Sequence, residues 1–195
     1  MNEYKAKTFA NLTNLKNISA IQIEEHLKLY NGYINNVNGL IKLLNDRIAK
    51  QNFEGPEFSE VVRHLGFEYN GMRLHEFYFE NLNATGGDQS KAKKLVKLIE
   101  DNFGSFEAFK NYFVKVASIR GVGWTLLCQN CDNEQLSVHW INSHEDGHVT
   151  GFEPIIVMDL WEHAWTAYLK PTERAKYIED FLANLDWKVC EDRLV

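Results

Sequence analysis

The stretch that decides the fold is EPIIVMDLWEHAWTAYL, residues 153–169. The apolar run at 155–158 leads into Asp159 as a buried strand would, and residues 160–168 have the composition of a helix. Asp159 therefore lies where the predicted strand ends, and His163 lies on the first turn of the predicted helix. The change of chain direction between them can point a carboxylate and an imidazole at one place, which is the geometry of a metal site.

The donor atoms of this stretch indicate which metals it suits. An oxygen ligand beside nitrogen ligands suits iron, manganese or zinc, and two further histidines would complete a set of four. The string D-x-W-E-H-A, from Asp159 to Ala164, closely resembles the signature of the iron/manganese superoxide dismutases. This resemblance implies that Asp159 and His163 are two of four protein ligands to the metal of an enzyme that acts on superoxide.

A long helix is predicted near the N-terminus. Ser19 and Gln22 form an S-x-x-Q capping box that starts it. Apolar residues then follow in alternating steps of four and three, which predicts a helix to about Gln51 that packs along its length against another helix. The apolar positions are Ile23, Leu27, Tyr30, Ile34, Val37, Ile41, Leu44 and Ile48.

His26 lies one residue outside this apolar stripe and shares a helix face with Tyr30 and Tyr33. Taken alone, a histidine there is more often a packed, hydrogen-bonded residue than a ligand. The string I-S-A-x-x-I-E-x-H that ends at His26 resembles the segment in which the family places its first ligand. The resemblance therefore assigns His26 to the metal.

The second half of a helical hairpin follows a turn at Gly55 and Pro56. One helical stretch is predicted at 59–65, ending at Gly66, and another begins near Tyr69. In the string GMRLHEFYFENL, His75 resembles the second histidine ligand of the family. An antiparallel hairpin would bring His26 and His75 face to face.

The predicted architecture is α+β, with an N-terminal antiparallel helical hairpin followed by a domain that has a small three-stranded antiparallel sheet. Residues 85–88, TGGD, are the most linker-like in the chain, so we expect domains at 1–86 and 87–195. The strands are predicted at 124–129, 135–142 and 153–159, and the helices of this domain at 90–101, 105–119, 161–168 and 173–189.

The resemblance implies a ligand set of His26, His75, Asp159 and His163, two from each domain, that holds one iron or manganese ion per subunit. The two metals use the same ligands and are distinguished by small differences in the surrounding hydrogen bonds, so the sequence leaves the choice open. Two other interpretations stay open: a zinc hydrolase, which three histidines and an aspartate would allow, and a metal-binding scaffold without activity.

Groups beside the ligands are also implied by the resemblance. In the family a glutamine bonds the solvent on the metal from one of two positions. Here these positions hold Gly71, which has no side chain, and His144, so His144 is the expected solvent partner. Trp124 and Trp161 would line the site and keep it dry, although both could simply be core residues.

The expected entrance to the site departs from the family. There a histidine and a tyrosine follow the first ligand by four and eight residues, and the histidine bonds a tyrosine of the other subunit. Here Tyr30 stands at the histidine's place and Tyr33 lies one residue early for the tyrosine, so either could donate a proton to the bound solvent. Thr166 stands where the partner tyrosine is expected, so both halves of that bridge are missing. Arg174 resembles the arginine that guides substrate inward.

A homodimer, with tetramers possible, is the expected assembly. Glu162 resembles the family's interface residue, which accepts a hydrogen bond from His163 of the partner subunit. The 195 residues carry a net charge of -6, which argues against a nucleic acid or an anionic membrane as partner, although local Lys and Arg could still attract superoxide.

The cytoplasm is the expected location. No apolar run approaches the roughly 20 residues that cross a bilayer, and residues 1–9 lack an apolar signal core. The three cysteines indicate reduced thiols. Cys128 and Cys131 could be half of a zinc knuckle or a redox pair, but the chain has no second pair.

Overall fold

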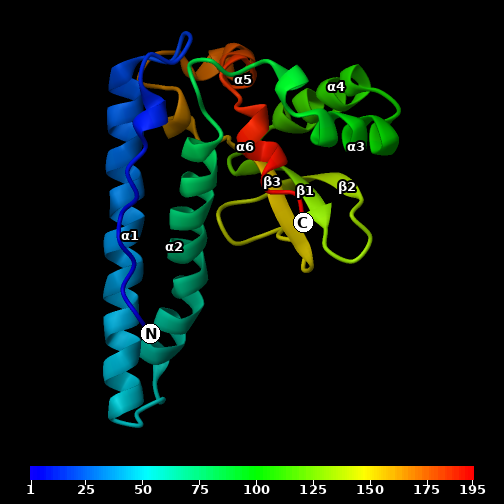
Figure 1. Cartoon of the computed structure of the whole chain (residues 1–195). Coiled ribbons are helices and arrows are strands. Elements are labelled where there is room, and N and C mark those ends of the chain that lie inside the picture. The colour runs from blue at the N-terminus through cyan, green and yellow to red at the C-terminus, as the bar shows by residue number, and fades with distance from the viewer.

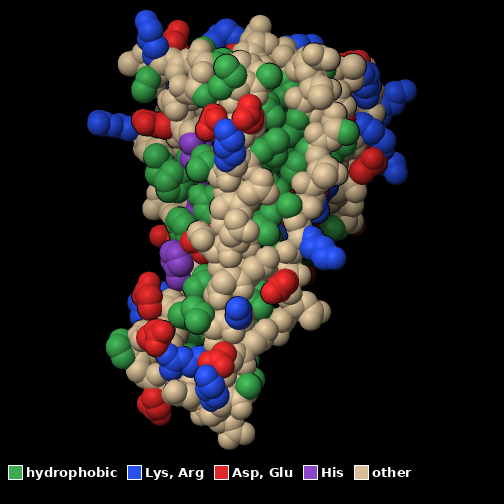
Figure 2. Space-filling model, turned by 90° about the vertical axis from the view of Figure 1, so that its left-hand side faces the viewer, with side chains coloured by type: hydrophobic (Ala, Val, Ile, Leu, Met, Phe, Trp, Pro, Cys, Tyr) green, Lys and Arg blue, Asp and Glu red, His purple; other side chains and the backbone are tan.

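The computed structural model describes residues 1–195 and divides into a hairpin of two long helices and an α+β part with a three-stranded antiparallel sheet (Figure 1). This is the predicted fold class. The two helices stand side by side at one edge of the molecule, and the sheet and the shorter helices lie beside the upper half of the hairpin. No helix is long and apolar enough to span a membrane. Acidic, basic and hydrophobic side chains are intermixed over the face that carries the first helix (Figure 2).

The first helix, α1 (Ala20–Ala49), packs with the predicted stripe inward. Six of its eight apolar positions are buried, whereas Leu27 is half-buried and Ile48 is exposed near the end of the helix. The hydroxyl of Ser19 caps α1 by accepting a bond from the Gln22 N–H at 3.1 Å, as predicted. The reciprocal half of the capping box is wrong, because the Gln22 side chain bonds the chain beyond β3 instead.

The second helix, α2 (Pro56–Glu80), is continuous, so the predicted break at Gly66 is wrong. A glycine inside a helix costs only about 1 kcal/mol relative to alanine. Packing of α2 along α1 outweighs that cost, as it does for most helices in proteins. Phe67 is thereby held on the helix that also carries His75.

The sheet consists of β1 (Trp124–Asn130), β2 (Leu136–Ile141) and β3 (Phe152–Asp159), in the order β2-β1-β3 with both pairs antiparallel. The central strand β1 is buried along nearly its whole length. Its register pairs Trp124 with Asp159 on one side and with Ile141 on the other. Trp124 is therefore fixed next to the residue on which the predicted site depends.

The helices α3 (Lys93–Phe103) and α4 (Phe106–Ala117) match the predicted pair, and the Ser105 hydroxyl caps α4 by accepting the Ala108 N–H. The predicted start of the first of them at Ser90 is wrong. Residues Gln89–Lys91 form a separate 3-10 turn, because the side chain of Asp88 accepts the Ser90 N–H.

The C-terminal helix predicted at 173–189 is divided into α5 (Arg174–Ala183) and α6 (Trp187–Glu191), after a 3-10 turn at Pro171–Glu173. The break has a tertiary cause. Leu185 pairs with Leu82 in a β-bridge, and the Asp186 N–H donates to the carbonyl of Asn81 at 2.6 Å. These contacts take the backbone groups that a continuous helix would have used.

The helix predicted at 161–168 is also wrong. Only Glu162–Ala164 forms a 3-10 turn, and the residues to 169 continue as irregular turns. The Ala167 N–H donates to the side-chain oxygen of Gln22, at 3.0 Å, rather than to the chain's own carbonyl groups. His163 therefore lies in a turn held by a residue on α1.

The hairpin and the α+β part are joined near the chain end. Arg193 donates to the side-chain oxygen of Asn81 at 2.6 Å and to the carbonyl of Ile155 at 3.0 Å, which ties α6 to α2 and β3. The division into domains at 1–86 and 87–195 stays a prediction.

The cysteines are all free. Cys131 is exposed in the turn after β1, whereas Cys128 and Cys190 are buried. Burial raises the pKa of the Cys128 thiol to about 12, so this group is protonated at neutral pH.

Candidate metal centre

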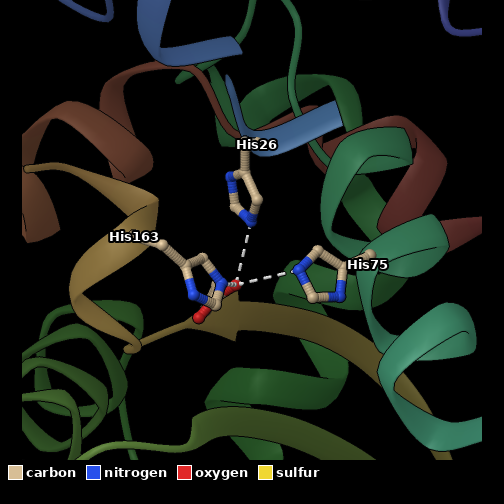
Figure 3. A group of neighbouring side chains, drawn as sticks. His26, His75 and His163 are labelled. Carbon is tan, nitrogen blue, oxygen red and sulfur yellow. Dashed lines mark hydrogen bonds and ion pairs between the residues drawn. The ribbon is translucent and has the colours of Figure 1, made fainter. Parts of the chain in front are cut away.

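Four side chains converge where the hairpin meets the end of the sheet. They come from α1 (His26), α2 (His75), the last residue of β3 (Asp159) and the 3-10 turn that follows it (His163). One ring nitrogen from each histidine and one carboxylate oxygen lie within 4.8 Å of one another. Figure 3 shows the three imidazoles approaching one point from three directions. The structure thus brings together all four residues that the resemblance implied.

The carboxylate oxygen Oδ2 of Asp159 is the common neighbour of the rings. It lies 3.1 Å from His26 Nε2, 3.2 Å from His163 Nε2 and 3.6 Å from His75 Nε2. The side chains of Asp159, His26 and His75 are fully buried, and that of His163 is 22% exposed. The cluster is therefore dry on the hairpin side and reaches the surface at His163.

The protonation states suit a metal ion. His75 donates its Nδ1–H to the carbonyl of Gly71 at 2.6 Å, so its Nε2 presents a lone pair to the cluster, and this buried atom has no hydrogen-bond partner. Burial lowers the pKa of both His26 and His75 below the ordinary value. Burial opposes ionisation of Asp159, but His163 and His26 together hold the pKa of that carboxyl well below its usual range.

Two buried imidazoles, a third that reaches the surface and a carboxylate offer four ligand atoms at one place, and one of them, the Nε2 atom of His75, has no hydrogen-bond partner. A buried nitrogen that lacks a partner is costly unless something binds it. Such a set of nitrogen and oxygen donors fits an iron, manganese or zinc ion. The residues present therefore fit the metal that the sequence implied.

Local hydrogen bonds fix the end of β3. The other carboxylate oxygen of Asp159, Oδ1, accepts the Trp161 N–H at 2.8 Å, which turns the chain sharply after the strand. The backbone carbonyl of Asp159 accepts the hydroxyl of Tyr177 at 2.7 Å. Such contacts orient a metal ligand before the metal binds.

A chain of three aromatic side chains lies beside the cluster. Trp124 Nε1–H donates to His144 Nδ1 at 3.0 Å, and His144 Nε2 lies 2.7 Å from the hydroxyl of Tyr33. An indole nitrogen can only donate, so Nδ1 accepts and a neutral His144 carries its proton on Nε2. Burial lowers the pKa of His144 to about 4, which keeps it neutral at physiological pH. His144 therefore donates to the Tyr33 oxygen, and the hydroxyl proton of Tyr33 is left for another acceptor.

The space beside Gly71 is taken by Tyr33. A Cβ atom on Gly71 would lie 2.5 Å from the Tyr33 ring, which is closer than real contacts allow. The ring of Tyr33 lies 5.0 Å from that of His75. The Tyr33 ring can therefore occupy this position only because residue 71 has no side chain.

Tyr30 lies in a different environment, although it shares the helix face. Its hydroxyl donates to the buried carboxylate of Glu76 at 3.0 Å and accepts the Lys7 N–H at 3.0 Å. Burial raises the pKa of Tyr30 to about 12. Because both hydrogen-bonding roles of its hydroxyl are taken, the geometry favours Tyr33 over Tyr30 as the proton donor.

The predicted tryptophans do line the cluster. Trp124 is fully buried, and its ring lies edge-on to His75 at 5.1 Å. Trp161 is half-buried, and its ring stacks with that of His144 at 4.9 Å and with that of His163 at 5.9 Å.

Arg174 contacts none of the four ligands. Its guanidinium donates to the carbonyl of Gly121 at 2.7 Å and lies over the rings of Trp140 and Trp165. Burial lowers its pKa. Two of its other nitrogen atoms, Nε and Nη2, are buried without a partner. The bond to Gly121 ties Arg174 to the loop before β1 rather than to the cluster.

Glu162, His163 and Thr166 lie on one accessible stretch. Glu162 and Thr166 are exposed, and the Glu162 carboxylate has no partner within the chain. The second ring nitrogen of His163 also has none.

Sequence reasoning missed three residues at the site. Gln22 was assigned to the helix cap, Phe67 to a break between helices, and Tyr177 to an ordinary helix. Phe67 packs on the His144 ring at 4.6 Å. Nothing in the local sequence marks these three residues as part of the site.

The fold and the cluster define a class of protein: a helical hairpin and an α+β part that hold a single metal-binding set of three histidines and one aspartate between them. A family model described as iron/manganese superoxide dismutases, C-terminal domain, matches residues 91–193. An iron superoxide dismutase of Aquifex aeolicus is 35% identical over 185 residues, which are 92% of this chain and 85% of that protein.

Two further relatives are also superoxide dismutases. An iron superoxide dismutase of Pyrobaculum aerophilum is 32% identical over 87% of this chain and 80% of its own length. A manganese/iron superoxide dismutase of Aeropyrum pernix is 29% identical over 91% of this chain and 82% of its own length. The chain belongs to the iron/manganese superoxide dismutase family.

Proposed function

We propose that this chain converts superoxide to dioxygen and hydrogen peroxide at one iron or manganese ion, held by His26, His75, Asp159 and His163. The observation that carries the proposal is the convergence of these four ligand atoms within 4.8 Å in a largely buried site. The ion supplies one-electron redox chemistry when bound, so that one superoxide loses an electron and the next gains one. The chain's own residues hold the ion, exclude water and supply protons.

The proton supply is assigned to Tyr33. Formation of hydrogen peroxide consumes two protons, so a donor must reach the site. His144 donates its Nε2–H to the Tyr33 oxygen, which leaves the hydroxyl proton of Tyr33 free to be given to an acceptor in the site. Burial raises the pKa of Tyr33, which keeps that proton in place until it is needed.

Both ring nitrogens of His144 are used by Trp124 and Tyr33, so His144 is proposed to act on solvent at the ion through the hydroxyl of Tyr33. Trp124 orients His144 by fixing which ring nitrogen carries the proton. Such hydrogen bonds tune the metal, and iron or manganese can each be used by members of the family. We assign no preference between the two metals.

A homodimer is the proposed assembly. The exposed carboxylate of Glu162 and the second ring nitrogen of the partly exposed His163 have no partner within the chain, which suits a bond to Glu162 from His163 of the partner subunit. Arg174 is proposed to shape the loop around the entrance rather than to contact superoxide.

The free cysteines support the cytoplasm as the location.

The test of the function is superoxide decay measured on one preparation before metal removal, after removal, and after loading with iron, manganese or zinc. Activity should disappear with the metal and return with iron or manganese but not with zinc. A chain that stays inactive when filled with either redox metal would overturn the proposal. Hydrolytic activity with zinc would favour the hydrolase interpretation.

A further inference from the structure

Gln22 is a fully buried polar residue on the first turn of α1, and its side chain bonds a distant part of the chain. Its Nε2 donates to the carbonyl of His163 at 2.6 Å, and its Oε1 accepts the Ala167 N–H at 3.0 Å. Both ends of the amide are therefore used on the segment that follows β3. The backbone of Gln22 is itself fixed, since its N–H is capped by Ser19.

The two groups that Gln22 bonds are a helical pair. In an α-helix the N–H of residue 167 would donate to the carbonyl of residue 163, four positions earlier. Bonds of this kind are present from Thr166 to Glu162 at 3.0 Å and from Leu169 to Trp165 at 2.9 Å, whereas the Tyr168 N–H donates to the Trp165 carbonyl, three positions earlier, at 3.0 Å. The amide of Gln22 is thus inserted where the bond from residue 167 to residue 163 would form, and such an insertion opens the turn.

The opened turn bears directly on His163. The carbonyl that Gln22 holds belongs to this histidine, whose ring nitrogen lies 3.2 Å from Asp159 Oδ2. Without the insertion, the carbonyl of His163 and the N–H of Ala167 would be free to bond each other. That bond would convert the 3-10 turn into a regular helical turn and move the His163 ring relative to Asp159.

We propose that Gln22 is a positioning residue that sets the place of the His163 ligand by holding the turn after β3 open. The inference rests on the proposed function, because it takes His163 to be a metal ligand. It gives α1 two contributions to the site: His26 as a ligand, and Gln22 one turn earlier as the support of another ligand.

Gln22→Met tests the proposal, because methionine is close in size and apolar but cannot bond either backbone group. Ser19→Ala is the matched control, since it weakens the same helix start and leaves the Gln22 side chain in place. The full-length protein loaded with iron or manganese is exposed to a chelator, and metal release and the visible absorption of the trivalent ion are recorded.

The Gln22→Met variant should release metal roughly 10-fold faster or more, since residues that orient ligands typically affect affinity by 10- to 100-fold. Its absorption bands should shift, because the position of a ligand changes. Ser19→Ala should keep the release rate and the spectrum of the wild type. Release and spectrum unchanged in Gln22→Met, or changed equally in both variants, would overturn the inference.

Gln22→Glu provides a second measurement if the methionine variant does not fold. When ionised, its carboxylate can accept the Ala167 N–H but cannot donate to the His163 carbonyl, whereas the protonated acid can do both. Release relative to wild type should therefore become faster as pH is raised and the carboxyl ionises, and a glutamate variant that matches wild type at every pH would contradict the proposal. Wild-type protein that retains neither iron nor manganese would instead overturn the proposed function itself.

Discussion

His144 offers the sharpest test of the hydrogen-bonded chain beside the cluster. It accepts from Trp124 and donates to Tyr33, at 3.0 and 2.7 Å. Glutamine can reproduce both roles, with its oxygen accepting from Trp124 and its amide donating to Tyr33. Leucine fills similar space and can do neither. Comparison of His144→Gln with His144→Leu therefore separates hydrogen bonding from packing.

The expected change in the free energy of unfolding follows from these two hydrogen bonds. A neutral buried hydrogen bond contributes about 1 kcal/mol, and a buried donor left without a partner costs about 1–3 kcal/mol. His144→Leu leaves the Trp124 N–H unpaired inside the protein, so we expect a loss of about 2–4 kcal/mol in the free energy of unfolding. For a chain of this size that lowers Tm by roughly 5–15 °C. His144→Gln should stay within about 1 kcal/mol of wild type.

The pH dependence of stability gives a second test, which concerns the neutral state of His144. Burial lowers the pKa of His144 to about 4 in the folded protein, against 6.5 for an ordinary histidine. Below pH 6.5 His144 is protonated in the unfolded chain but stays neutral in the folded chain. The free energy of unfolding is therefore highest above pH 6.5 and decreases as the pH falls toward 4. Glutamine does not titrate, so the free energy of unfolding of His144→Gln should decrease less steeply with falling pH than that of wild type. The difference in slope should be up to about 1.4 kcal/mol per pH unit.

The assay is denaturant unfolding of wild type and both variants at equal measured metal content, at several pH values between about 7 and about 5. A leucine variant as stable as wild type would refute the hydrogen-bonded chain. A glutamine variant whose stability follows wild type at every pH would refute the neutral state assigned to His144.

Five further substitutions test the rest of the site. Tyr33→Phe should lower turnover on the order of 10-fold or more with metal content unchanged, since it removes a proton donor. Tyr30→Phe should lower stability but not turnover. If rapid measurements of superoxide decay show the larger loss in Tyr30→Phe, the two assignments are exchanged. His163→Ala should abolish metal retention, and full occupancy by elemental analysis would remove it from the ligands. Glu162→Ala should weaken the dimer, and an unchanged sedimentation profile on dilution would exclude the bridge. Gly71→Ala should cost about 1–3 kcal/mol by displacing the Tyr33 ring, so wild-type unfolding would contradict that contact.

The ligand cluster was accessible from the sequence because each histidine and the aspartate lie in strings with fixed spacing. The D-x-W-E-H-A string places Asp159 and His163 close together, and the strings around His26 and His75 resemble the segments in which the family has its first two histidine ligands. These are local patterns, so one sequence suffices to see them. The first long helix and the positions of the three strands along the chain were predicted for the same reason.

The errors in the fold have tertiary causes. The helix expected at 161–168 is opened by Gln22, which lies far away in the sequence, and the helix expected at 173–189 is divided by contacts with Asn81 and Leu82. Gly66 did not break α2, since packing along α1 outweighs the cost of one glycine. Local propensity cannot register such contacts.

The choice between Tyr30 and Tyr33 shows the same limit at the site. Both share a face of α1, and the sequence could not separate them. Their hydroxyls differ because Glu76 and Lys7 take one and His144 takes the other. Those partners come from other elements, so only the three-dimensional structure distinguishes the tyrosines.

The most direct test of the central claim is the rate of superoxide decay per bound metal ion, with occupancy determined on the same samples of iron-loaded and manganese-loaded protein. We expect one ion per chain and a rate that rises in proportion to bound iron, bound manganese or both, from zero in the metal-free chain. Fully occupied samples of both metals that leave superoxide decay at its spontaneous rate would contradict the account.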